Sequence, residues 1–311
     1  MVFGEGPLKD IYRRLIWGPY RWALERAPAS AEVRVNRGLG RVAAAVLHGR
    51  RTSLESTLRV ALGEGSDPAK VARQCFQTHF ANQYVGFGFA KMGSGEIGDY
   101  LEVEGLAHVD RALERGQGVV LAHPHMGLPQ LALHAMGLMG YSVHQVGGGR
   151  TAVAKSPMGE RVASRRDALE ERLCATMHDG QAYVRPLLRA LRENSVVFTA
   201  CDGTGGGEEI GRRSTQTVLG QPYALPVFPV WLCQRSGAQL IPASCVSEPS
   251  RPWRQRVRFE APIPVTEETE ALEALAGRLS GWLRESPGDW HFWDQWRRGV
   301  GGLLTGEPAD G

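Results

Sequence analysis

The sequence predicts an α/β fold in which a mostly parallel central sheet is flanked by helices and preceded by a helical N-terminal part. Short β-branched runs at 118–123 and 195–201 have the continuous apolar character of strands that are buried on both faces of a parallel sheet. Segments with helical periodicity separate these runs, and this alternation is typical of layered α/β domains. Before residue 100 the apolar spacing is helical throughout.

The composition is that of an ordinary globular protein. Of the 311 residues, 42% are apolar and 22% are charged, and no stretch is apolar for long enough to form a transmembrane helix. The five cysteines are scattered, which favours a reducing compartment over a disulfide framework or a zinc knuckle. The first residues lack the pattern of a secretory signal. We therefore expect a cytoplasmic protein.

The charge of the chain is unevenly distributed. The formal net charge is +3, but residues 1–60 alone carry +6. A basic leading segment favours a polyanionic partner, such as an anionic membrane surface, an acidic carrier protein or nucleic acid. Its arginines alternate with apolar residues and no nucleic-acid-binding motif accompanies them, so nucleic acid is not expected. A solvated helical face remains the alternative.

The first helix carries one apolar stripe, formed by Leu8, Ile11, Tyr12, Leu15 and Ile16. Pro19 is expected to kink or end this helix. Aromatic residues and arginines beside the stripe are typical of a helix that lies in a membrane interface, although packing on the protein body would also explain it. Further helices are predicted over 32–48 and 68–92, the second with a cap at Asp67 followed by proline.

Beyond residue 100, strands and helices alternate. Strands are predicted at 100–104, 118–123, 141–146, 195–201, 239–246 and 255–260. Helices are predicted at 106–115, 129–139, across 158–192, at 226–236 and at 268–284. The chain shows neither an internal repeat nor a linker. We therefore expect a helical segment over 1–98, which docks on a membrane or a carrier, and an α/β core over 99–311, together forming one compact unit.

The most informative stretch follows the strand at 118–123. Pro124, His125, Met126 and Gly127 turn the chain into a helix that Pro129 can open. Ligands of open α/β sheets bind outside the carboxyl ends of the strands, so His125 lies where a catalytic residue is expected. Imidazole is a suitable general base at neutral pH, and backbone amides near Met126 and Gly127 could stabilise developing negative charge. A purely structural histidine is the alternative.

Four segments resemble one known family. The run GVVLAHPHMG is similar to the block with the HX4(D/E) motif of the lysophospholipid acyltransferase superfamily, in its bacterial lipid A late-acyltransferase branch. That branch also contains the phosphatidylinositol mannoside acyltransferases. Segments 187–202, 219–242 and 290–297 resemble further blocks of the branch, in the same order along the chain. The resemblance covers most of residues 10–298.

The resemblance implies an acyltransferase. The acyl group would move from a thioester of acyl carrier protein or coenzyme A to an acceptor hydroxyl or amine on a glycolipid, a lysophospholipid or a lipid-like metabolite. It implies that His125 is the general base, that the acyl thioester is a co-substrate, and that no further cofactor or metal takes part. Members of the branch commonly carry an N-terminal membrane anchor, whereas the basic, aromatic-bearing N-terminal helices of this chain favour a peripheral position on the inner face of the cytoplasmic membrane.

One position departs from the family pattern. Gln130 occupies the place of the acidic residue that orients the imidazole in relatives. An amide can accept a hydrogen bond from His125, but it carries no charge to balance an imidazolium. Asp202 ends the next predicted strand and matches an aspartate of the family, so we predict that it supplies the missing acid. The alternative is a non-catalytic relative that binds acyl chains or acyl carrier protein and whose site has decayed.

The resemblance implies that one arginine of the segment 161–172 binds a phosphate of the donor or the acceptor. The candidates are Arg161, Arg165, Arg166 and Arg172. A guanidinium group suits bidentate contacts with phosphate. A solvated helix face is the alternative for each of them.

Three weaker signals are interpreted as structural. His123 and His125 have the spacing of metal ligands, but no further ligand cluster completes a site, and no metal is expected. The glycine-rich segments 147–149 and 203–207 lack the order of a phosphate-binding loop and are interpreted as loops around the site. Cys201 is interpreted as a buried strand cysteine rather than a nucleophile.

Overall fold

The computed structural model describes residues 6–147, 156–179, 184–203 and 211–298, and it confirms the predicted fold class. A seven-stranded sheet has the order β1-β9-β8-β2-β5-β3-β4. Its strands are β1 (Leu101–Glu104), β2 (Val119–His123), β3 (Val143–Gly147), β4 (Thr176–Asp179), β5 (Val196–Ala200), β8 (Gln239–Ser247) and β9 (Gln255–Phe259). All neighbouring pairs are parallel except β8–β9, which is antiparallel.

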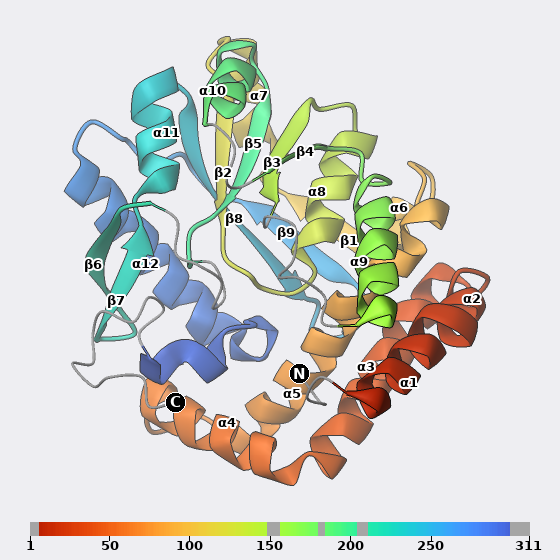
Figure 1. Ribbon diagram of the computed structural model, residues 1–311. Coiled ribbons are helices and arrows are strands. Elements are labelled where there is room, and N and C mark those ends of the chain that lie inside the picture. Colours follow the sequence, from red (N-terminus) through yellow and green to blue (C-terminus); the bar gives the residue numbers. More distant parts are fainter. Residues whose placement is uncertain (1–5, 148–155, 180–183, 204–210, 299–311) are drawn as a thin grey trace.

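Helices cover both faces of this sheet (Figure 1). One face packs against α7 (Leu106–Glu114) and α8 (Pro129–Leu138), the other against α10 (Arg185–Arg192), α11 (Phe228–Ser236) and α12 (Glu268–Glu285). The side chains of β2 alternate between these two cores. Val119 and Leu121 point to the first core and Val120 to the second, all fully buried. This double burial explains the uninterrupted apolar run of the strand.

The N-terminal third is helical, as predicted. It contains α1 (Pro7–Leu15), a π-helical turn (Ile16–Tyr20), α2 (Arg21–Leu24), α3 (Ala29–Val46), α4 (His48–Leu62), α5 (Pro68–Tyr84), a 3₁₀ helix (Val85–Lys91) and α6 (Ile97–Tyr100). Pro19 lies inside the π-helical turn and does not end the helix. Asp67 caps α5 by accepting a hydrogen bond from the Lys70 amide at 2.9 Å, which confirms the predicted cap. Within the described residues, no helix is both long and apolar enough to cross a bilayer.

Two parts of the fold differ from the prediction. The segment 158–192 is not helical throughout, because α9 (Pro157–Glu170) and α10 flank the edge strand β4. That strand has four residues and includes His178 and Asp179, so it lacks the apolar run of a buried strand. A hairpin of β6 (Arg213–Val218) and β7 (Gln221–Pro226) was also not predicted. Its turn places Leu219 and Gly220 at positive φ, and leucine gives no turn signal there.

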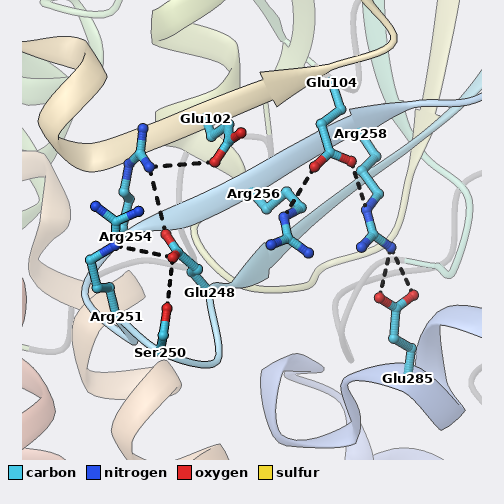
Figure 2. A network of polar contacts seen from close by, with 9 residues as sticks. All are labelled: Glu102, Glu104, Glu248, Ser250, Arg251, Arg254, Arg256, Arg258 and Glu285. Atoms are coloured by element: carbon cyan, nitrogen blue, oxygen red, sulfur yellow. Dashed lines mark hydrogen bonds and ion pairs between the residues drawn. The ribbon is translucent and has the colours of Figure 1, made fainter.

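Ion pairs cross the outer edge of the sheet (Figure 2). Arg256 and Arg258 of β9 both pair with Glu104 of β1, at 3.2 and 3.1 Å. Arg258 also contacts Glu285 of α12 at 2.7 Å. Arg254 lies 3.4 Å from Glu102 and completes the row. These arginines have acidic partners from neighbouring elements, so the edge carries compensated charge, which also discourages pairing with another strand.

Candidate active site

The fold brings His125 and Asp202 together at the carboxyl ends of two adjacent strands. His123 and Ala200 are paired in the register of β2 and β5, and the Cys201 amide donates to the His123 carbonyl at 2.9 Å. Beyond the end of each strand, one polar side chain follows: His125 after β2 and Asp202 after β5. His125 Nδ1 lies 2.7 Å from Asp202 Oδ1, within the range of a charge-assisted hydrogen bond.

The carboxylate of Asp202 is fully buried and surrounded by donors. Oδ2 accepts hydrogen bonds from the His125 amide at 2.7 Å and from Trp290 Nε1 at 2.8 Å. The Tyr223 hydroxyl donates to the backbone carbonyl of the same aspartate at 2.8 Å. Burial alone raises the pKa of Asp202, but attraction to His125 and the hydrogen bonds from His125 and Trp290 outweigh it. The pKa therefore lies below its ordinary value and the group is a carboxylate at neutral pH.

The contact with Asp202 determines which nitrogen of the His125 imidazole carries the proton. An ionised carboxylate only accepts hydrogen bonds, so Nδ1 carries the proton and Nε2 carries the lone pair. The ring of Phe292 lies 4.4 Å away, centroid to centroid, and limits the rotation of the imidazole. About a third of the His125 side chain is exposed, at 32%, whereas Asp202 is inaccessible. This arrangement leaves the imidazole partly at the surface and its negatively charged partner in the interior.

A segment near the C-terminus packs along the turn that carries His125. The Gly127 amide donates to the Asp289 carbonyl at 2.9 Å, and the His291 amide donates to the His125 carbonyl at 3.0 Å. The His291 ring donates from Nε2 to the Gly127 carbonyl at 2.8 Å. Burial, with a smaller repulsion from His79, lowers the pKa of His291 to about 3, so this ring is neutral. His291 thus supports the turn.

The backbone amides of Met126 and Gly127, which were expected to stabilise an oxyanion, already donate hydrogen bonds within the protein. The Met126 amide donates to the Pro124 carbonyl at 2.8 Å, and the Gly127 amide is bonded to Asp289. Gly127 has a φ of 60°, and a Cβ there would lie 2.5 Å from the Cys245 carbonyl oxygen. Glycine is therefore required at this position. Met126 and Gly127 shape the turn, and neither N–H is free to bind a substrate in this conformation.

The sequence matches the profile of a known protein family. The profile of bacterial lipid A biosynthesis acyltransferases matches residues 18–298. The chain belongs to this family. It is 27% identical over 281 residues to a phosphatidylinositol mannoside acyltransferase of Mycolicibacterium smegmatis, covering 87% of each protein. It is 31% identical over 196 residues to a protein of the same description from Mycobacterium tuberculosis, covering 61% of this chain and 58% of that one.

No hydrogen bond connects Gln130 of the acyltransferase to His125 in the part of the chain that the structure describes. Gln130 lies in the first turn of α8 and is partly buried. No hydrogen bond of its side chain occurs within the described part of the chain, whereas Asp202 holds His125 Nδ1 directly. Of the two side chains considered as partners of the imidazole, Asp202 is hydrogen-bonded to the His125 ring and Gln130 is not.

The predicted phosphate-binding arginines lie on a different element. Arg161, Arg165 and Arg166 are exposed on α9. Arg165 Nη1 donates to the Trp17 carbonyl at 3.0 Å and ties α9 to the N-terminal helices. In the residues that the structure describes, no hydrogen bond or ion pair connects these arginines to His125 or Asp202. Their role in phosphate binding stays a prediction.

His123 has surroundings unlike those of His125. Burial, with a smaller repulsion from His125, lowers the pKa of His123 to about 4, so the ring is neutral. The ring centroids of the two histidines are 6.1 Å apart. His123 lines a small cavity of about 10 Å³ that Phe198 and Ser244 also line. Throughout the described residues, no cluster of three or more histidine, cysteine, aspartate or glutamate side chains could hold a metal.

Other predicted site features are placed as follows. Cys201 is fully buried, and burial raises the pKa of its thiol, as expected of a structural cysteine. The segments 147–149 and 203–207 lie outside the described residues, except Gly147 and Gly203. Two donors to Asp202, Trp290 and Tyr223, were not predicted. For Trp290 the available signal was its place in the C-terminal tryptophan-rich segment, but the sequence alone does not indicate its partner.

Proposed function

We propose that His125 is the general base of an acyl transfer from a thioester to an acceptor hydroxyl, and that Asp202 is its orienting acid. The observation that carries the proposal is the 2.7 Å contact between His125 Nδ1 and the fully buried Asp202 carboxylate. A partner of this kind fixes the tautomer with a lone pair on Nε2 and stabilises the imidazolium that forms during the reaction.

The reaction follows from this assignment. Nε2 of His125 takes the proton from the acceptor hydroxyl as its oxygen forms a bond to the thioester carbonyl carbon. The tetrahedral intermediate collapses and the carbon–sulfur bond breaks. The imidazolium then returns its proton to the departing thiolate, so the products are an ester and a free thiol. The buried negative charge of Asp202 stabilises the positive charge on the ring between these two proton transfers.

The substrates are proposed from the resemblance and the relatives. The donor is an acyl thioester of coenzyme A or acyl carrier protein. Because relatives are described as phosphatidylinositol mannoside acyltransferases, we propose a sugar hydroxyl of a glycolipid as the acceptor. Acceptors of this class reside in a membrane, so the enzyme needs access to the bilayer surface.

The N-terminal helices support docking on an anionic membrane. On α1, Leu8, Ile11 and Leu15 are more than half exposed, at 70%, 54% and 57%, and therefore form an outward apolar stripe. Trp22 of α2 is 60% exposed. Arginines lie in the last turn of α1, beside the stripe. Apolar residues with adjacent cations suit insertion among anionic headgroups, and we propose this surface as the peripheral membrane contact on the cytoplasmic side.

Thioester turnover tests the catalytic proposal. Purified enzyme is mixed with acyl-coenzyme A or acyl carrier protein thioesters and a panel of glycolipid, lysophospholipid and small-molecule acceptors, and products are identified by mass spectrometry. His125→Ala is expected to lower turnover by about 10²–10⁴-fold, the usual contribution of a general base. His108→Ala, on α7, is the matched control and should retain activity. Wild-type turnover in His125→Ala would refute the assignment.

Vesicle co-sedimentation tests the membrane proposal separately. Binding to phosphatidylglycerol-containing vesicles is compared with binding to neutral phosphatidylcholine vesicles. Leu8→Ser combined with Leu15→Ser should weaken binding to the anionic vesicles. Met139→Ser is the control, because Met139 is also exposed but follows α8 at the far end of the sheet. Equal binding of the double variant and the wild type would refute this surface.

A further inference from the structure

The segment that packs along the catalytic turn is itself held by one buried carboxylate. Asp289 is 6% exposed and is bonded through both oxygens. Oδ1 accepts hydrogen bonds from the Thr78 hydroxyl of α5 at 2.9 Å and from the Ser247 hydroxyl of β8 at 2.7 Å. Oδ2 accepts one from the Ser247 amide at 2.8 Å. These bonds join the segment to two elements that are remote in sequence.

A buried arginine completes the arrangement. Arg37 of α3 is 7% exposed, and its Nη1 donates to the Ser247 hydroxyl at 3.2 Å and to the Thr78 hydroxyl at 3.4 Å. Each hydroxyl thus accepts from Arg37 and donates to Asp289, so the two hydroxyls link the opposite charges. Burial lowers the pKa of Arg37, and the negative charge of Asp289 opposes that shift. A buried charge is stable only when it is paired and hydrogen-bonded. The two hydroxyls, which we call the hydroxyl relay, meet this requirement for Arg37 and Asp289.

The residues that follow Asp289 make the contacts that define the site. Trp290 donates to Asp202 Oδ2, and Met126 and Trp290 form an antiparallel bridge. His291 supports the turn through the carbonyls of His125 and Gly127. The carboxylate of Asp289 therefore fixes the start of the segment that contains Trp290 and His291. These two residues contact His125 and Asp202, which together form the candidate catalytic dyad.

We propose that Asp289 is a positioning residue of the acyltransferase, which acts through Trp290 to orient Asp202 toward His125. The proposal rests on the proposed function for the roles of His125 and Asp202. It assigns Arg37 and the two hydroxyls to the same task, and it makes α3, in the N-terminal helical segment, part of the support of the active site. Asp289 does not touch the reacting atoms.

A double-mutant cycle tests the route through Trp290. Asp289→Asn places an amide where three donors converge, and Trp290→Phe removes the indole donor to Asp202. Each variant should lower kcat by about 10²-fold with little change in the KM of the donor, because misplacement by about 1 Å has that effect. The double variant should be no slower than Trp290→Phe alone, since Asp289 acts through that residue. Asp294→Asn, an exposed acid in the same segment, is the control and should match the wild type.

A second readout does not depend on turnover. The pKa of the His125 imidazole, followed by NMR, should move downward in Asp289→Asn and in Trp290→Phe, because an Asp202 carboxylate that is no longer held toward the ring stabilises the imidazolium less. A residue that only stabilises the fold would leave this titration unchanged. Loss of turnover in His125→Ala tests the proposed function, so the two proposals can fail separately.

The outcomes that overturn the proposal are specific. A wild-type titration and kcat in Asp289→Asn would refute it, and so would fully multiplicative effects of the two substitutions on kcat. If Asp289→Asn does not fold, Thr78→Val and Ser247→Ala each remove one hydroxyl of the relay. They should shift the His125 titration in the same direction by a smaller amount, and an unchanged titration in both would refute the proposal.

Discussion

Two buried carboxylates in different regions of the molecule have opposite protonation behaviour. Asp202 lies at the carboxyl ends of the central strands and Glu32 lies in the first turn of α3, and both are 0% exposed. The Asp202 carboxylate accepts three hydrogen bonds from His125 and Trp290, and its pKa is lowered. Burial raises the pKa of Glu32 to about 8, only partly opposed by Lys91.

The difference arises from the donors and not from burial. Neither oxygen of Glu32 accepts a hydrogen bond within the described part of the chain, and Lys91 Nζ remains 3.6 Å away. That ammonium group instead donates to the carbonyls of Leu24 and Ala27, at 2.6 and 2.8 Å. Desolvation favours the neutral acid, and only converging donors reverse this effect. A buried carboxyl is thus suited to orient a catalytic base only where the fold supplies donors.

The largest expected effect comes from Asp202→Asn. The His125 amide and Trp290 Nε1 both donate to one side of this group, so the asparagine should turn its oxygen toward them. Its NH₂ then faces His125 Nδ1 and forces the tautomer that carries the proton on Nε2, which cannot act as a base. By analogy with the acid-to-amide change in serine proteases, kcat should fall by about 10⁴-fold. Thiol release from the acyl donor measures it.

Two comparisons make this result decisive. Asp294→Asn removes an exposed carboxylate that forms no hydrogen bond or ion pair with His125 or Asp202 in the described residues, and it should retain wild-type turnover. Turnover of Asp202→Asn within tenfold of the wild type would show that the imidazole does not depend on this partner. In that case the contact between His125 and Asp202 would be structural, and the comparison with Glu32 would have no bearing on catalysis.

Glu32→Gln should change the pH dependence of stability. The folded pKa of about 8 lies above the ordinary glutamate value of 4.5, so between these values the folded state binds more protons than the unfolded state. The stability that the neutral acid provides is present below about pH 4.5 and is lost as the pH rises through 8. Glutamine mimics the neutral acid, so the stability of the variant relative to the wild type should increase by about 4 kcal/mol from pH 5 to pH 9.

Denaturant unfolding at a series of pH values measures this gain. Glu273→Gln, on the exposed side of α12, is the matched control and should follow the wild-type curve. A wild-type curve that runs parallel to that of Glu32→Gln across this pH range would contradict the raised pKa. Turnover should be unchanged at a pH where both proteins are folded, because no hydrogen bond or ion pair in the described residues connects Glu32 to His125, Asp202 or Asp289.

The sequence predicts one side of the site better than the other. The runs at 118–123 and 195–201 are local signals of buried parallel strands, and the carboxyl ends of such strands meet, so His125 and Asp202 could be placed from sequence. Trp290 lies 88 residues beyond Asp202 and donates through a contact that only tertiary packing creates. The same limit applies to Asp289, whose partners come from α3, α5 and β8. Short polar strands such as β4 carry no apolar pattern to detect.

The smallest expected effect is that of Gln130, the position where the chain departs from the family motif. Its side chain forms no hydrogen bond within the described residues, and Asp202 already occupies the position against His125 Nδ1. Gln130→Ala and Gln130→Glu should both change kcat by less than about threefold, as for a substitution outside any named network. Steady-state kinetics measured beside Asp202→Asn check this. A loss of tenfold or more in Gln130→Ala would show that the glutamine approaches the base or the substrate during turnover, and the acid would then share its orienting role.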